Sequence, residues 1–215
     1  MTQTPQQTEA ETWFRDLRHR IVASLEAIEN EYAAEKGGDA ARFEIKPWSR
    51  QDISGQPGGG EMGLIRGQVF EKGGVNVSTV WGEFSEDFRK AIPGAEDNNG
   101  AFWASGISLV IHPRNPFVPP VHMNTRHIVT SKGWFGGGAD LNPIYAVDED
   151  TAYFHEELKK CCGEFGADYY ERFAKWADEY FWNKHRNEPR GVGGIFFDWL
   201  YPQAEKGGWE ANFAF

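Results

Sequence analysis

FWASGISLVIH, residues 102–112, is the stretch that decides the fold class of this 215-residue chain. It is rich in β-branched and aromatic residues, as is VNVSTVWGEF at 75–84, and such composition is typical of β-strands. Glycines separate these segments and no helical pattern intervenes, which favours consecutive antiparallel strands over strand–helix–strand units. The predicted strands are 62–70, 73–84, 101–112, 121–130 and 191–198.

Helical periodicity flanks these strands on both sides. Apolar side chains recur at helical spacing through residues 8–36, where Thr8 and Glu11 form a predicted capping box. Two further helices are predicted, at 149–165 and 167–186, each with an apolar stripe. The expected fold is therefore α+β, a large antiparallel sheet with helices packed on it.

The chain suits one domain spanning 1–215. The glycine-rich segment ISGQPGGGEMG at 53–63 is predicted to be a connecting loop. It lacks the Gly-Lys-Ser/Thr of a phosphate-binding loop, so no nucleotide site is expected there. Aromatic residues make up 15% of the chain, which fits either a large core or a pocket for a large flat ligand.

Composition argues against several partners. The net charge is −10 and the basic residues are scattered, whereas a nucleic-acid binder usually presents a basic face. No apolar run approaches the ~20 residues that a membrane span needs. The two cysteines, Cys161 and Cys162, are adjacent and have no other cysteine to pair with, so a reducing cytoplasm is expected.

A polar triplet marks the candidate site. In the segment 108–127, SLVIHPRNPFVPPVHMNTRH, strand alternation puts His122, Asn124 and Arg126 on one face. A solvated outer face is one interpretation. An anion site is the other, because arginine binds carboxylates bidentately and histidine can carry a proton near neutral pH. Asp140 follows three glycines, a place where backbone can approach a ligand closely.

Three segments together resemble one known family. HPRNPFVPPVHMNTR at 112–126, GWFGGGADLNP at 133–143 and FWNKHRNEPRGVGGIFFD at 181–198 are similar to the oxygen-dependent coproporphyrinogen III oxidases. The resemblance implies oxidative decarboxylation of two propionates of coproporphyrinogen III to vinyl groups, giving protoporphyrinogen IX in haem biosynthesis. It implies molecular oxygen as co-substrate, no organic cofactor, and a homodimer whose large antiparallel sheet is covered by helices on both faces.

The resemblance also implies roles for individual residues. Catalysis is expected of His122 as proton donor, Asp140 facing the pyrrole nitrogens, and Arg126. Substrate binding is expected of Ser108, Asn124, Thr125 and Arg126. A divalent metal is expected on His112, His122, His155 and His185. His19 and His127 are expected at the surface.

Two expectations qualify this function. The substrate carries four carboxylates and the protein is acidic, so the site is expected to be locally basic. Members of the family extend beyond residue 215, so the domain is expected to be incomplete at its C-terminal end. The alternatives are a truncated, inactive tetrapyrrole-binding form and an unrelated non-haem metal oxygenase built on the histidines.

Overall fold

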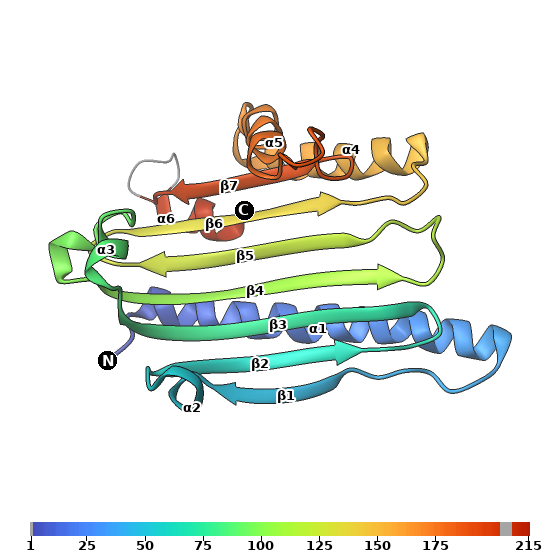
Figure 1. Cartoon of the computed structure of the whole chain (residues 1–215), viewed down its shortest axis with the longest axis horizontal. Coiled ribbons are helices and arrows are strands. Elements are labelled where there is room, and N and C mark those ends of the chain that lie inside the picture. The colour runs from blue at the N-terminus through green and yellow to red at the C-terminus, as the bar shows by residue number, and fades with distance from the viewer. Residues whose placement is uncertain (1, 203–207) are drawn as a thin grey trace.

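A computed structural model describes residues 2–202 and 208–215, and its centre is one seven-stranded antiparallel sheet (Figure 1). Strand order follows chain order, so every strand pairs with its neighbours in the sequence. The predicted α+β fold with consecutive antiparallel strands is confirmed. The strands are β1 (Glu44–Ser49), β2 (Gly58–Ile65), β3 (Phe70–Glu83), β4 (Ala101–Pro113), β5 (Val121–Val129), β6 (Gly133–Leu141) and β7 (Gly194–Leu200).

Two strands, β1 and β6, are not predicted from the sequence. β1 contains Pro47, which an edge strand tolerates because one side of its ladder is unpaired. β6 contains Gly136–Gly138, and its strand conformation is imposed by pairing with β5 and β7 on either side. The predicted loop at 53–63 is likewise wrong in part, because its glycines Gly58–Gly60 pair with β3.

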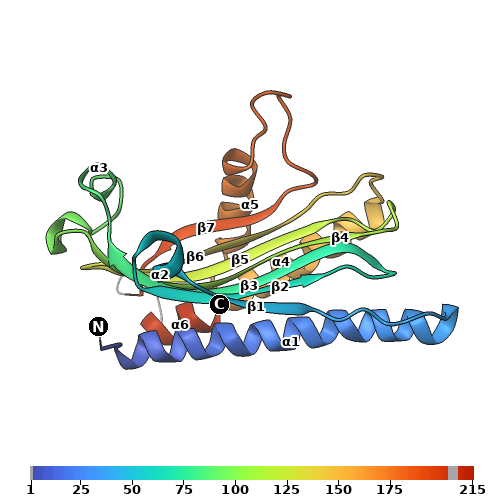
Figure 2. The ribbon, with the colours of Figure 1, turned by 60° about the horizontal axis from the view of Figure 1, so that its bottom comes forward.

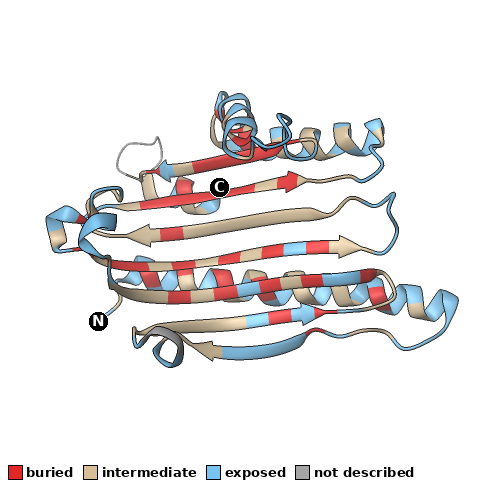
Figure 3. Ribbon diagram, viewed as in Figure 1, coloured by how far each residue is buried: buried red, intermediate tan, exposed pale blue. Residues whose placement is uncertain are grey.

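The two faces of the sheet differ in burial, as the stripes of Figure 3 show. In the middle of β3 and β4 the odd-numbered residues, such as Val77 and Ile107, are buried. Helix α1 (Pro5–Lys36) packs on this side through Phe14, so we call it the covered face. We call the other side the open face. Its β4 residue Val110 is 41% exposed.

α1 begins earlier than predicted. The capping box is formed by Thr4 and Gln7, with the Gln7 backbone N–H donating to Thr4 Oγ1 at 3.2 Å. Pro5 occupies the first turn, where its missing N–H costs no helical bond. The predicted box at Thr8 and Glu11 is wrong. Thr8 already lies inside the helix and donates its hydroxyl to the Thr4 carbonyl.

The last three helices are α4 (Asp148–Phe165), α5 (Tyr169–Tyr180) and α6 (Gly208–Ala214). Two of them, α4 and α5, pack against β7, and α6 packs on Phe135 of β6 through Trp209. α5 wraps the sheet edge: Phe173 meets Phe197 on the covered face, and Tyr180 stacks on Phe196 on the open face. The predicted helix 167–186 is too long, because residues 181–193 form a loop.

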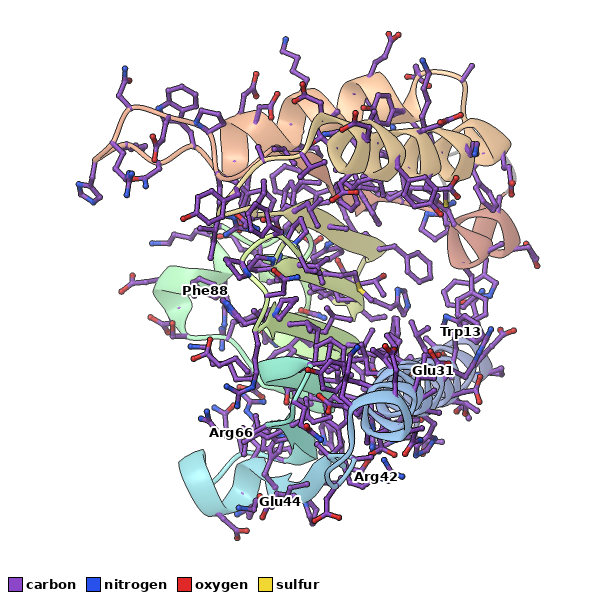
Figure 4. The ribbon with its side chains drawn as sticks, turned by 90° about the vertical axis from the view of Figure 1, so that its right-hand side faces the viewer. Trp13, Glu31, Arg42, Glu44, Arg66 and Phe88 are labelled. Carbon is purple, nitrogen blue, oxygen red and sulfur yellow. The ribbon has the colours of Figure 1, made fainter. Side chains whose placement is uncertain are left out.

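Helical segments lie on both sides of the sheet plane. Figure 2 shows α1 and α6 beneath the sheet and α5 rising beside β7. The short α3 (Glu86–Arg89) carries Phe88 on the side opposite Trp13 of α1 (Figure 4). The remaining short elements are α2 (Arg50–Ser54) and the 3-10 helix η1 (Glu96–Asn98). The middle of the open face, over β3 to β5, carries no helix among the described residues (Figure 1).

His127 is a correction to the predicted surface residues. Its side chain is on the covered face, 3% exposed, and stacks on Phe135 at a centroid distance of 4.5 Å. Burial lowers the pKa of His127 to about 4, although its hydrogen bond to the Trp134 carbonyl opposes this shift.

No helix in residues 2–202 and 208–215 combines the length and the apolar composition needed to cross a bilayer.

Candidate functional site

The open face gathers the polar side chains predicted from strand alternation. Ser108 on β4 is the cross-strand partner of Asn124 on β5. His122 on β5 is the partner of Asp140 on β6, and Arg126 follows Asn124 at the next position on this face. The predicted common face of His122, Asn124 and Arg126 is confirmed.

Asp140 is the buried centre of the group. It is 0% exposed, and its Oδ1 lies 2.6 Å from Nδ1 of His122. Burial alone would raise the pKa of Asp140, but hydrogen bonds from His122, Arg190 and Asn142 lower it below its usual value. The ionised carboxylate makes Nδ1 of His122 the protonated nitrogen, which leaves Nε2 for the neighbouring pocket.

Arg190 is the functional residue that sequence reasoning missed. It lies in the loop 181–193, and its Nη2 and Nε donate to the two oxygens of Asp140 at 2.7 and 2.9 Å. Its guanidinium also lies over the Phe181 ring, 3.7 Å from the centroid. The residue stands in the segment 181–198 that carries the resemblance, but a loop has no periodicity to say where its side chains point.

Arg126 has a carboxylate partner as well. Its Nη2 donates to Oδ2 of Asp198 at 2.8 Å and its Nη1 to the Asn124 side chain at 3.1 Å. The register of β6 and β7 shifts here, and Trp199 has a positive φ of 55°, as expected for a β-bulge that redirects a side chain. Gly136 on β6 gives the pair its space, because a Cβ there would collide with Asp198.

Two ion pairs set the charge of the residues beside the pocket. Arg190 faces Asp140 and Arg126 faces Asp198, so the formal charges of these four side chains cancel. The four side chains thus form two neutral ion pairs, whereas the ionisable side chains that line the adjoining pocket are the basic ones Arg126, Arg190 and His122. A locally basic site stays a prediction.

Aromatic side chains complete a pocket beside the ion pairs. Its volume is about 550 Å³. Tyr180, Phe181, Trp182 and Phe196 form its aromatic wall, and the polar lining comes from His122, Asn124, Arg126 and Arg190. A smaller hollow of about 270 Å³ adjoins it over β3 to β5 and includes Ser78, Gly106 and Ser108. The two hollows share Asn124 and Arg126, so one extended ligand can reach both.

Thr125 faces away from this pocket. It is the cross-strand partner of the buried Ile107, and it lines a separate cavity of about 530 Å³ on the covered face with Phe14 of α1. Its side chain therefore does not join Ser108, Asn124 and Arg126, and only its main chain is available to the open face.

The four histidines of the expected metal set do not converge. His112 and His122 lie on neighbouring strands, His185 is exposed in the loop 181–193, and His155 lies on α4. His155 Nε2 is 2.8 Å from the Val192 carbonyl oxygen, and its Nδ1 is 2.9 Å from the Tyr170 hydroxyl. Within the described residues, no three histidine, cysteine or acidic side chains are grouped to hold a metal ion. The metal site stays a prediction that these positions do not fit.

Comparison with known proteins matches this chain to one family. The family model for coproporphyrinogen III oxidase covers residues 9–215. The oxygen-dependent coproporphyrinogen-III oxidase of Rickettsia bellii (strain OSU 85-389) is 50% identical over 204 residues, 95% of this chain and 70% of the relative. That of Rickettsia felis (strain ATCC VR-1525 / URRWXCal2) is 52% identical over 206 residues, 96% of this chain and 71% of the relative. The similarity thus includes every strand of the sheet and both arginine-bearing parts of the site.

Proposed function

Because the chain belongs to the coproporphyrinogen III oxidase family, we propose that it converts coproporphyrinogen III to protoporphyrinogen IX with molecular oxygen. Each reacting propionate, R–CH2–CH2–COO⁻, combines with O2 and one proton to give R–CH=CH2, CO2 and H2O2. The bond to the carboxylate breaks, and its electron pair forms the vinyl double bond. The ring-side methylene loses a hydrogen with two electrons, which reduce the oxygen.

The observation that carries this proposal is the pair of arginines at an aromatic pocket. A guanidinium has five N–H donors. Arg126 uses Nη1 and Nη2, and Arg190 uses Nε and Nη2, in their bonds to the protein. Both therefore keep N–H donors for a substrate carboxylate, and their fixed orientation favours bidentate binding. The aromatic wall suits the apolar macrocycle.

His122 supplies the proton that the balance requires. Its Nδ1–H donates to Asp140, so Nε2 is the atom that takes up a second proton from solvent and passes it to the departing hydroperoxide anion. Asp140 acts through His122 and Arg190 by fixing the orientation of both. Its oxygens already accept bonds from protein groups, so a pyrrole N–H would reach it only by replacing one of them.

Ser108 and Asn124 extend the substrate site across the open face. They line the smaller hollow next to the pocket, where Gly106 and Ser78 leave space because their side chains are small. We assign this hollow to a part of the tetrapyrrole that carries a propionate not undergoing reaction. The homodimer and the divalent metal stay predictions from the resemblance, and the cytoplasmic location stays a prediction from the two cysteines.

The test is an oxygen-initiated turnover assay of the chain. Coproporphyrinogen III is mixed with the protein under anaerobic conditions, and air is then admitted. The product is followed as protoporphyrin fluorescence after oxidation, together with the release of carbon dioxide. Oxygen-dependent product that is lost in Arg126→Ala and kept in Arg20→Ala, an exposed arginine of α1, supports the proposal. Retained substrate binding with no product in the wild-type chain would contradict it and favour the binding-only form.

A further inference from the structure

His155 joins three elements that meet beside β7. It lies on α4, and its Nδ1 is 2.9 Å from the hydroxyl of Tyr170 on α5. Its Nε2 is 2.8 Å from the carbonyl oxygen of Val192, in the loop 181–193. One half-buried side chain thus connects two helices to the loop that carries Arg190.

The partners of His155 determine which nitrogen carries its proton. A carbonyl oxygen can only accept, so Nε2 carries the hydrogen and donates it to Val192. Nδ1 is then an acceptor, and the Tyr170 hydroxyl donates to it. A metal ion needs an imidazole nitrogen with a free lone pair, and here the lone pair of Nδ1 already binds Tyr170. Binding a metal would break this link.

The segment held by His155 is also tied to the site. The Val192 N–H donates to the Leu141 carbonyl at 3.0 Å, and the Leu141 N–H donates to the Gly193 carbonyl at 3.2 Å. Leu141 directly follows Asp140, the carboxylate that pairs with Arg190. Gly191 has a φ of 59° and no room for a Cβ beside the Leu141 carbonyl, so the backbone at this point is closely fitted.

We propose that His155 is a positioning residue for Arg190 and not a metal ligand. The proposal rests on the function given above, in which Arg190 binds a propionate. The main-chain bonds to Leu141 hold Val192 from the β6 side, and His155 holds the same residue from the α4 side. Support from both sides fixes the point where the loop 181–193 enters β7. It thereby also fixes the distance over which Arg190 reaches Asp140.

Three variants separate positioning from metal binding. In His155→Gln the side-chain amide can still donate to Val192 and accept from Tyr170, whereas His155→Ala can do neither. Tyr170→Phe removes only the hydroxyl that orients the imidazole. The matched controls are His19→Gln and Tyr153→Phe, which change exposed residues on α1 and α4.

Positioning predicts a graded kinetic pattern. His155→Ala should lower kcat/KM about tenfold or more, mainly by raising KM, because the propionate anchor is displaced. His155→Gln should recover most of this loss, and Tyr170→Phe should fall between Gln and Ala. Amide hydrogen exchange should speed up in 181–193 in the Ala variant and stay unchanged in β3 to β5.

Metal analysis of the purified proteins distinguishes a positioning role of His155 from metal binding. Equal metal content in wild type and all variants, with rescue by Gln, supports the proposal. Stoichiometric metal in wild type that is lost in both His155 variants, with Tyr170→Phe behaving as wild type, would overturn it. If the wild-type chain has no turnover, the proposed function fails, while hydrogen exchange and metal content still decide the role of His155.

Discussion

Replacing Arg190 by lysine tests whether the bidentate pairing with Asp140 holds this residue in position. The guanidinium reaches both oxygens of Asp140, at 2.7 and 2.9 Å, and covers the Phe181 ring. A lysine keeps the positive charge but presents a single ammonium, which cannot hold both oxygens in that geometry. The substitution therefore removes the bidentate pairing with Asp140 and keeps the positive charge.

The expected loss follows from these contacts. One charge-assisted hydrogen bond is worth about 1.5–3 kcal/mol, and the contact with the ring about 0.5–1 kcal/mol. The Arg190 side chain is 41% exposed, so water compensates part of the loss. We take about 2 kcal/mol for the whole change, which corresponds to roughly a 30-fold lower kcat/KM.

Initial-rate kinetics under saturating oxygen measure this loss. The matched control is Arg186→Lys, because Arg186 lies in the same loop and pairs with exposed Glu188 instead of with a residue of the site. An Arg190→Lys enzyme within about threefold of wild type would refute the pairing as the source of Arg190's position. An equal loss in the Arg186 variant would refute it too, since that would make the effect a property of the loop.

Three further predictions concern residues around the site. Asp198→Asn should raise KM about tenfold with little change in kcat, because Arg126 loses its ionic partner; steady-state kinetics in which kcat falls as much would contradict this. Thr125→Val should keep KM within about twofold, since this side chain lies on the covered face; a tenfold rise would place it at the substrate. His127 has a folded pKa of about 4, so the unfolded chain takes up the proton first. The free energy of unfolding should drop by about 3 kcal/mol from pH 6.5 to pH 4 on this account. Urea titrations at several pH values should show that His127→Phe lacks this part of the drop. The same fall in the free energy of unfolding with pH in the variant and in wild type would contradict the prediction.

The sheet could be predicted wherever the sequence alternates strongly. The segments at 73–84 and 101–112 carry β-branched and aromatic residues on one face, and the structure has strands at both places. β1 and β6 could not be found in this way, because proline and glycine weaken the local preference and neighbouring strands supply it. The helix predicted at 167–186 included Phe181 and Trp182. In the structure these apolar side chains line the pocket and are not part of a helix.

The site could be predicted in part for a related reason. Period-two alternation correctly placed His122, Asn124 and Arg126 together, since β5 is regular. Arg190 could not be placed, because its position depends on bonds between a loop and β6 that are remote in sequence. Asp198 could not be placed either, since the bulge at Trp199 interrupts the alternation that would have assigned its direction.

The sequential strand order has a consequence for how the protein is made. Strands that pair with their sequence neighbours close short loops, which costs little chain entropy, so β1 to β6 can assemble one after another during synthesis. β7 is different, because residues 142–193 separate it from β6. A nascent chain can therefore bring His122 to Asp140 in the β5–β6 hairpin well before Arg190 leaves the ribosome. Docking of β7 is then also the step that completes both ion pairs.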